Sequence, residues 1–278
     1  MAMDWQSEGP GQTPQQQPEP EPWNHIVDPQ PGQPHTHTVI LLHGRGDNAR
    51  DFKRSIQYNT WADSQRQSPI EVVPSFRWVF PTAGLKPCEQ PGNPRYMSQW
   101  FDLWDHTNFK VREEVQAPGL RDSVGRIRNL IAEEAVRLGG RYDKIVLMGI
   151  SQGGATSVHT LLNLGFPEGY TGPRRLGAFV GVACRMPFPG RSLEDTRAIL
   201  GLGGVAGDEV VRNTPIMLEH CVDDPVVRFE GGKQLRQQLE GYGANVAWRE
   251  YPEGGHWFKS PEGLDDLTAF LSQVLVKD

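Results

Sequence analysis

Ser151 lies in a pattern that can make a serine hydroxyl reactive. The sequence Gly149-Ile150-Ser151-Gln152-Gly153 follows an apolar run typical of a buried strand, Lys144 to Met148, and precedes small and apolar residues that fit a helix. A G-x-S-x-G sequence at such a junction is typical of a nucleophile elbow, a strained turn that leaves the serine exposed. The two glycines lack the Cβ atoms that would clash where strand and helix are drawn together. Ser151 is therefore a candidate nucleophile, although the pattern can also arise by chance in a chain with 31 glycines.

A serine hydroxyl is a poor nucleophile without a base, so the assignment depends on partners elsewhere in the chain. His256 follows a Gly-Gly turn after the last expected strand, and Asp223 and Asp224 follow the strand before it. Because the carboxyl ends of parallel strands share one edge of a sheet, these side chains and Ser151 are expected on the same rim. The chain order Ser, Asp, His is that of an α/β-hydrolase, with either aspartate as the acid.

Apolar runs and helical patterns alternate along the chain in the manner of a parallel sheet covered by helices. Together with the elbow and the order Ser, Asp, His, this alternation predicts an α/β-hydrolase fold, with a mostly parallel central sheet and helices on both faces. Strands are expected at 38–42, 76–80, 144–149, 176–183, 215–219 and 245–250, and helices at 50–67, after Ser151, at 120–138, 193–200, through 235–239 and after 260.

An irregular stretch with four prolines and several aromatic residues runs from Thr82 to Pro118. Irregular segments of this length inside a compact domain tend to be functional. Trp100, Phe101 and Trp104 could line a substrate site as an apolar wall for an acyl chain. Ordinary core packing is the alternative, since large aromatic side chains are core residues first.

Residues 1–35 differ in composition from the rest of the chain. Eight of the 23 prolines fall in this segment, interleaved with Gln and Glu, and too little apolar surface is present to offset the entropy of ordering it. We expect a disordered tail at 1–35 and a catalytic domain at 36–278. The tail holds five acidic residues and no Lys or Arg, so the formal charge of −6 becomes about −1 without it (−6 + 5). That balance gives no electrostatic reason to expect a nucleic-acid partner.

No apolar run approaches the roughly 20 residues that span a bilayer, and the N-terminus lacks the basic and apolar regions of a secretory signal. Three cysteines are an odd and sparse set, which fits a reduced cytoplasmic or nuclear compartment. His43 and His220 lack both ligand spacing and carboxylate support, so we expect them to hold loops and expect no metal or other cofactor.

Six segments together resemble the phospholipase/carboxylesterase family, which includes the acyl-protein thioesterases, and the resemblance spans about residues 38–275. The resemblance implies a Ser hydrolase with Ser151 as nucleophile, His256 as base and Asp224, which directly precedes Pro-x-Val, as its orienting acid. It also implies an oxyanion hole formed by the backbone N–H groups of Arg45 and Gln152. The matching segments are His43 to Asp47, Phe80 to Ala83, Trp100 to Asp102, Gly149 to Ala155, Asp224 to Val227 and Gly255-His256.

The chain departs from the family pattern at three places. Cys221 stands where the family usually has glycine after His220, Arg228 stands where it usually has proline, and the stretch from Arg185 to Asn213 is longer than usual. These departures concern the loop geometry and the acyl channel rather than the triad.

The resemblance implies hydrolysis of a carboxylic ester or thioester through a covalent acyl-serine. The substrate would be a lipidated protein, a lysolipid or a small ester. A short-chain carboxylesterase or a lysophospholipase of the same fold is the first alternative, and a non-catalytic binding protein on the same fold is the alternative from another class. A dienelactone-type hydrolase fits less well because its elbow carries Cys where this chain has Ser151. No oligomeric state is specified.

Overall fold

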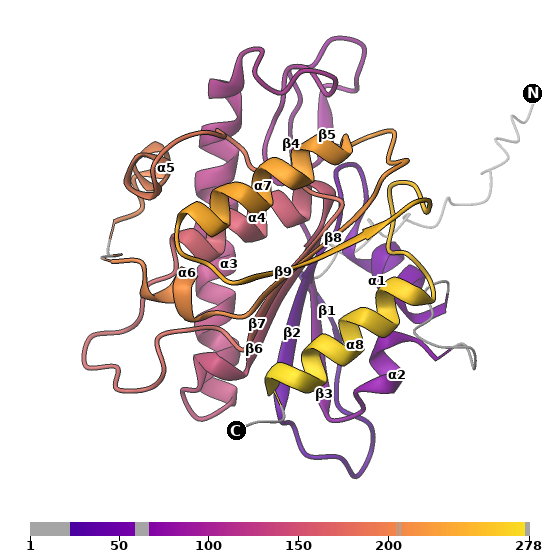
Figure 1. The fold of residues 1–278 in the computed structure, drawn as a ribbon, viewed down its shortest axis with the longest axis vertical. Coiled ribbons are helices and arrows are strands. Elements are labelled where there is room, and N and C mark those ends of the chain that lie inside the picture. Colours follow the sequence, from indigo (N-terminus) through magenta and orange to yellow (C-terminus); the bar gives the residue numbers. More distant parts are fainter. Residues whose placement is uncertain (1–22, 59–66, 204, 206, 276–278) are drawn as a thin grey trace, which may run out of the picture.

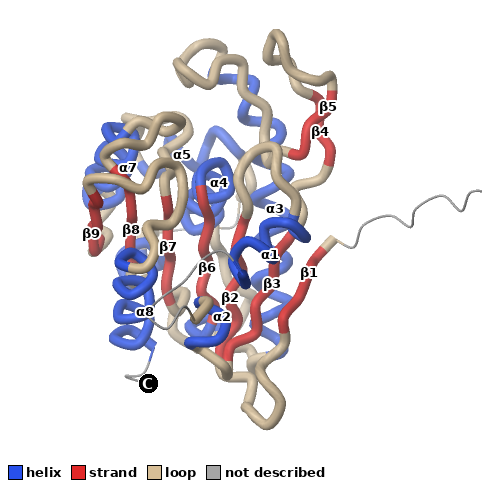
Figure 2. Tube along the Cα trace, turned by 90° about the vertical axis from the view of Figure 1, so that its right-hand side faces the viewer, coloured by secondary structure: helices blue, strands red, loops and turns tan. Residues whose placement is uncertain are grey.

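The computed structural model describes residues 23–58, 67–203, 205 and 207–275, and its centre is a seven-stranded sheet in the order β1-β3-β2-β6-β7-β8-β9. Neighbouring strands are parallel except for β1, which pairs antiparallel with β3. Figure 2 shows these strands side by side in that order. The expected mostly parallel sheet is confirmed. The strands are β1 Asn24–Val27, β2 His37–Leu42, β3 Phe76–Pro81, β6 Ile145–Ile150, β7 Ala178–Val182, β8 Ile216–Cys221 and β9 Val246–Tyr251.

Helices cover both faces of the sheet, as the sequence predicts (Figures 1 and 2). On one face lie α1 Ala49–Tyr58, α2 Pro69–Val72 and α8 Glu262–Leu275. On the other lie α3 Gln116–Arg137, α4 Ser151–Leu162 and α7 Phe229–Gly241, with the shorter α5 Leu193–Leu200 and α6 Glu209–Asn213 packed near them. None of the helices in the described ranges is both long and apolar enough to cross a membrane.

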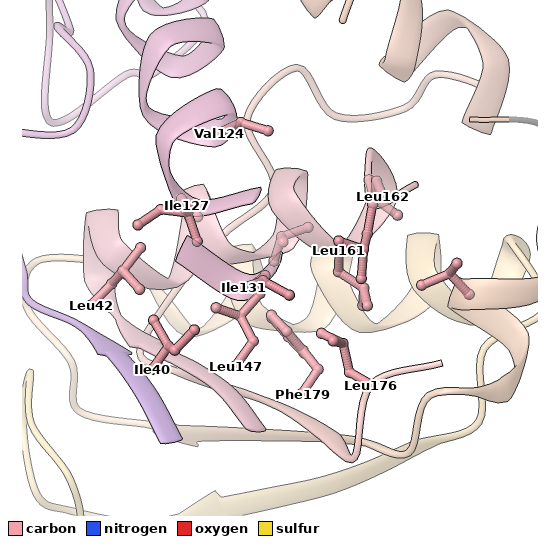
Figure 3. Close-up of a cluster of buried hydrophobic side chains, with 14 of the residues drawn as sticks. Ile40, Leu42, Val124, Ile127, Ile131, Leu147, Leu161, Leu162, Leu176 and Phe179 are labelled. Carbon is pink, nitrogen blue, oxygen red and sulfur yellow. The ribbon is translucent and has the colours of Figure 1, made fainter. Parts of the chain in front are cut away.

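Each face of the sheet has its own apolar core. Along β2, Ile40 and Leu42 point to the α3 and α4 side, while Val39 and Leu41 point to the α1 and α8 side. Figure 3 shows the first of these clusters, where Ile127 of α3 lies over the side chains of the central strands. Because both faces are covered, strands β6 and β7 are buried and apolar along their whole length and show no polar alternation.

The stretch from 82 to 118 contains a small hairpin beyond one end of the main sheet (Figures 1 and 2). Its strands are β4 Leu85–Pro87 and β5 Tyr96–Ser98, which pair antiparallel. The backbone N–H of Gly46, in the loop after β2, donates to the carbonyl oxygen of Ser98 at 2.7 Å. The hairpin is therefore fixed to the loop that carries Arg45.

The N-terminal boundary differs from our expectation of a disordered segment through residue 35. Asn24–Val27 forms β1 at the sheet edge, in register with Trp78 to Pro81 of β3. The Trp23 ring also packs under the Arg126 guanidinium, whose Cζ lies 3.4 Å from the ring centroid. Four ladder pairs and this stacked ring order a segment whose composition alone predicts disorder. The rest of the predicted tail, 1–22, and residues 59–66 of the helix predicted at 50–67 lie outside the described residues.

Candidate active site

Ser151 occupies a strained turn between β6 and α4. Its φ of +55° lies in the left-handed region that non-glycine residues seldom adopt. A Cβ on Gly149 would lie 2.5 Å from the carbonyl carbon of Gly153, and a Cβ on Gly153 would lie 2.4 Å from the carbonyl oxygens of Leu42 and His43. Both glycines are thus required by close backbone contacts, as the elbow interpretation predicts. Ser151 is the first residue of α4, where the backbone N–H groups of the first turn lack helical acceptors and favour negative charge.

His256 and Asp224 form a hydrogen-bonded pair at the same end of the sheet. The His256 Nδ1 lies 2.8 Å from Asp224 Oδ2. The Asp224 side chain is buried, whereas that of His256 is one-fifth exposed. A buried carboxylate on Nδ1 fixes the ring orientation and leaves Nε2 available to accept a proton.

Asp224 is held in its charged form by donors on several sides. Its Oδ1 accepts hydrogen bonds from the backbone N–H groups of Val226 at 2.8 Å and Val227 at 3.0 Å. The His220 Nε2–H donates to the Val227 carbonyl at 2.8 Å and lies 3.4 Å from Asp224 Oδ2. Burial alone would raise the pKa of Asp224, but the side chains of His220 and His256 and the loop N–H group outweigh it and hold that pKa well below its usual range. His220 thus positions the loop and the acid, in line with the role expected from the sequence.

Asp223 contacts the backbone before His256 rather than the His256 ring. Its carboxylate accepts hydrogen bonds from the backbone N–H groups of Gly255 at 2.8 Å and Gly254 at 3.3 Å. Gly254 and Gly255 both have positive φ, at +142° and +65°. Asp223 therefore holds the turn from which His256 projects, and of the two aspartates it is Asp224 that bonds the imidazole.

The loop after β2 lies against Ser151. A Cβ on Gly44 would lie 3.6 Å from Ser151 Cβ. The Arg45 side chain extends to the hairpin segment, where Nε donates to Gln99 Oε1 at 2.8 Å, Nη1 to Gln90 Oε1 at 2.9 Å and Nη2 to Cys88 Sγ at 3.1 Å. These bonds anchor the side chain to the hairpin, while the Arg45 backbone lies in the loop beside Ser151.

The Gln152 side chain joins the elbow to the aromatic segment. Its Oε1 accepts from the backbone N–H of Trp100 at 2.8 Å, and its Nε2 donates to the carbonyl oxygen of Phe101 at 2.7 Å. The Gln152 backbone N–H belongs to the first turn of α4. Arg45 and Gln152, the two residues expected to supply an oxyanion hole, are thus each fixed through their side chains.

His43 holds the loop before Arg45. The Ala83 N–H donates to His43 Nε2 at 3.1 Å, so the ring proton lies on Nδ1, which is 2.7 Å from the Gly44 carbonyl oxygen. Burial lowers the pKa of His43 and favours this neutral ring. Within the described ranges, no cluster of three His, Cys, Asp or Glu side chains could hold a metal ion.

Ser151 and His256 line one cavity of about 500 Å³, which we call the Ser151 cavity. Its volume lies in the range of small-molecule sites. Of the three aromatic residues proposed for substrate binding, Phe101 lines this cavity. Trp100 is fully buried and donates from Nε1 to the His43 carbonyl at 2.8 Å, so it packs behind the wall. Trp104 also lies outside the lining and stacks with Arg112 at 4.3 Å.

Several lining residues were not identified from the sequence. They come from loops that bear no periodic pattern, and only their position after strands or in the irregular stretch could have suggested them. They include Met97, Arg185, Val226, Val227 and Trp257. Leu103, His106 and Phe109 also line the cavity and belong to the irregular stretch that the sequence predicts to be functional.

The sheet order, the strained serine after β6 and the His–Asp pair after β9 and β8 define an α/β-hydrolase. A model of the phospholipase/carboxylesterase family matches residues 24–275. A relative named acyl-protein thioesterase 1, from Gibberella zeae, is 31% identical over 87% of this chain and 92% of its own length. The carboxylesterase SOBER1 of Arabidopsis thaliana is 25% identical over 81% of this chain and 85% of its own. The crystal structure of Zea mays acyl-protein thioesterase 2 superimposes with a TM-score of 0.66 at 22% identity, covering 91% of this chain and 98% of that one.

The chain belongs to the phospholipase/carboxylesterase family. It is a hydrolase of carboxylic esters or thioesters, as the resemblance implies.

Proposed function

We propose that this protein hydrolyses acyl esters or thioesters through an acyl-serine formed on Ser151, with His256 as base and Asp224 as the orienting acid. One observation carries the proposal most strongly: the His256 imidazole, fixed by Asp224 at 2.8 Å, lines the same cavity as Ser151. The strained φ of Ser151, which keeps its side chain exposed at the elbow, supports the same assignment.

The reaction follows from these positions. His256 Nε2 takes the Ser151 proton as the hydroxyl oxygen attacks the acyl carbonyl carbon, and the Asp224 carboxylate stabilises the imidazolium. The tetrahedral oxyanion is bound by the backbone N–H groups of Arg45 and Gln152. The imidazolium then protonates the leaving alcohol or thiol, and water, activated by the same imidazole, releases the acid and restores Ser151.

The proposed substrate is the acyl ester or thioester of a lipidated protein, a lysolipid or a small ester. Relatives named acyl-protein thioesterase support the first of these. A short-chain carboxylesterase is the second candidate, because Phe101 alone of the three aromatic residues reaches the cavity. The name of the Arabidopsis relative, a carboxylesterase, points the same way.

Ser151→Ala tests the mechanism. With 4-nitrophenyl butyrate as substrate, kcat should fall by up to about a million-fold, because members of a triad act as a unit. A fluorophosphonate probe should label the native protein and leave the variant unlabelled. A variant that keeps most of its activity would remove Ser151 from the mechanism. A native protein that the probe fails to label would favour the non-catalytic alternative.

The acyl preference is tested with 4-nitrophenyl esters from acetate to palmitate, with Ser151→Ala as the blank. A kcat/KM that rises beyond about eight carbons would indicate a long acyl channel, since each buried CH₂ contributes about 0.8 kcal/mol. A maximum at acetate or butyrate would instead identify a short-chain esterase.

A further inference from the structure

Arg185 lines both the Ser151 cavity and a second cavity of about 320 Å³. The second cavity also lies against residues 106–110 and the start of α7, and it shares five lining residues with the first: His106, Phe109, Arg185, Val226 and Val227. A group that extends from Ser151 past Phe109 would therefore meet the Arg185 side chain.

The Arg185 guanidinium is a buried cation held by neutral groups. The residue is only 9% exposed. Its Nη2 donates to Gln116 Oε1 at 2.9 Å, Nη1 lies 3.5 Å from the Met186 carbonyl oxygen, and the plane covers the Phe109 ring at 3.6 Å. Burial lowers the pKa of Arg185 to about 9, so the side chain still carries its charge at neutral pH.

No carboxylate in the described ranges forms an ion pair with Arg185. Glu113, whose charge acts on Arg185, is already bonded to Arg191 at 2.6 Å. The lining of the second cavity also includes two further cationic side chains, Lys110 and Arg228, and one carboxylate, Glu230. The net charge of these three residues is therefore positive and adds to that of Arg185. Removing a guanidinium from water without a counter-ion is unfavourable, and a bidentate anion is the partner that its planar donors match best.

We propose that Arg185 binds an anionic group of the substrate, a carboxylate or a phosphate, at the junction of the two cavities. This inference rests on the function proposed above and narrows its substrate to esters or thioesters with a negative charge away from the scissile carbonyl. The charge can lie on the acyl part, as in a monoester of a dicarboxylic acid, or on the leaving group, as in an acylated glycerol phosphate.

Two matched series test the proposal and distinguish these sources. In the first, mono-4-nitrophenyl esters of dicarboxylic acids with four to ten carbons are compared with 4-nitrophenyl esters of monocarboxylic acids of equal length. In the second, an acylglycerol phosphate is compared with the monoacylglycerol of the same acyl chain. The readout is the ratio of kcat/KM for the charged substrate to that for its neutral partner.

The native protein should favour the charged member of one series by about ten- to a hundredfold, the range expected for a hydrogen bond to a charged group. Arg185→Met should reduce that ratio at least tenfold, and Arg185→Lys, which keeps the charge but not the planar donors, should reduce it less. Arg236→Met is the matched control, since Arg236 is exposed on α7 and pairs with Glu240, and it should leave the ratio unchanged. A ratio near one in both series, or a ratio that Arg185→Met does not alter, would overturn the proposal.

Inhibition of the native protein tests the proposal without relying on a variant of Arg185 that folds. Free dicarboxylates should inhibit hydrolysis of a neutral ester competitively and more strongly than their uncharged diesters, and equal inhibition would count against an anion site. The neutral esters keep the two proposals separate: their hydrolysis, abolished in Ser151→Ala, tests the catalytic assignment whatever the charge preference proves to be.

Discussion

The Asp223 carboxylate accepts a hydrogen bond from the backbone N–H of Gly255 at 2.8 Å, directly before His256. Its neighbour Asp224 bonds the His256 ring itself at the same distance. Two adjacent acids thus fix one histidine in two ways, one through the turn that carries it and the other through its imidazole.

This division predicts unequal effects of two conservative substitutions. Asp224→Asn removes the charge that stabilises the imidazolium and allows the wrong ring tautomer, so kcat should fall by about 10⁴-fold. Asp223→Asn keeps an oxygen that can accept one of the two backbone N–H groups, so the loss should stay within about tenfold. Steady-state kinetics with 4-nitrophenyl butyrate compares the two variants. A larger loss in Asp223→Asn would reassign the orienting acid.

The close backbone contacts of the elbow glycines predict that the effect of a Gly→Ala substitution on stability depends on where the glycine lies. Gly153→Ala would place a Cβ 2.4 Å from two backbone carbonyl oxygens, so we expect a loss of about 3 kcal/mol or failure to fold. Gly125→Ala is the matched control, because Gly125 lies within α3 and a Cβ there would have no atom of the described residues within 4 Å. That variant should gain about 0.5–1 kcal/mol from helix propensity. Thermal and urea unfolding measure both, and equal effects would contradict the steric explanation.

Local sequence was sufficient to predict most of the sheet and the elbow. The central strands are continuous apolar runs, and the turn after β6 combines a small-residue pattern with a serine, so neighbours in the chain carry the signal. The edge strand β1 was missed because its stability comes from pairing with β3, about 50 residues away, and its own composition is that of a tail.

The residues that line the Ser151 cavity were harder to predict, because their positions also depend on contacts between distant parts of the chain. Trp100 and Phe101 are adjacent and similar in type, yet Gln152 holds their backbone so that only Phe101 reaches the cavity. Arg185 follows β7 in a loop without periodicity, and its burial depends on Phe109 and Gln116 from a distant segment. Such contacts join residues more than 50 positions apart, which a pattern along the chain does not encode.

The hydrogen bonds of the Arg45 side chain predict that it affects kcat, although it takes no part in the proposed reaction steps. Its three hydrogen bonds to Cys88, Gln90 and Gln99 hold the loop whose backbone N–H is proposed to bind the oxyanion. Arg45→Met should therefore lower kcat by about ten- to a hundredfold, less than the loss of an oxyanion donor itself, with a smaller change in KM. Arg54→Met, on the exposed side of α1, is the control and should behave as the native protein does. A change confined to KM would mean that the guanidinium contacts substrate instead.

The burial of Glu219 predicts how the free energy of unfolding depends on pH. Both of its carboxylate oxygens are buried and have no hydrogen-bond partner in the part of the chain that the structure describes, and burial together with the charge of Asp266 raises its pKa well above 4.5. The folded state therefore holds a proton that the unfolded state releases, so this stability is full below about pH 4.5 and is lost as the pH rises toward the folded-state pKa.

Glu219→Gln stays neutral at every pH. Its free energy of unfolding relative to the native protein should rise from pH 5 to pH 8, by up to about 1.4 kcal/mol per pH unit while the folded carboxyl remains protonated. Urea unfolding at several pH values measures this difference. Glu168→Gln, at an exposed loop position, should show no such trend. A difference that stays constant with pH in Glu219→Gln would mean that the Glu219 carboxyl is ionised in the folded protein.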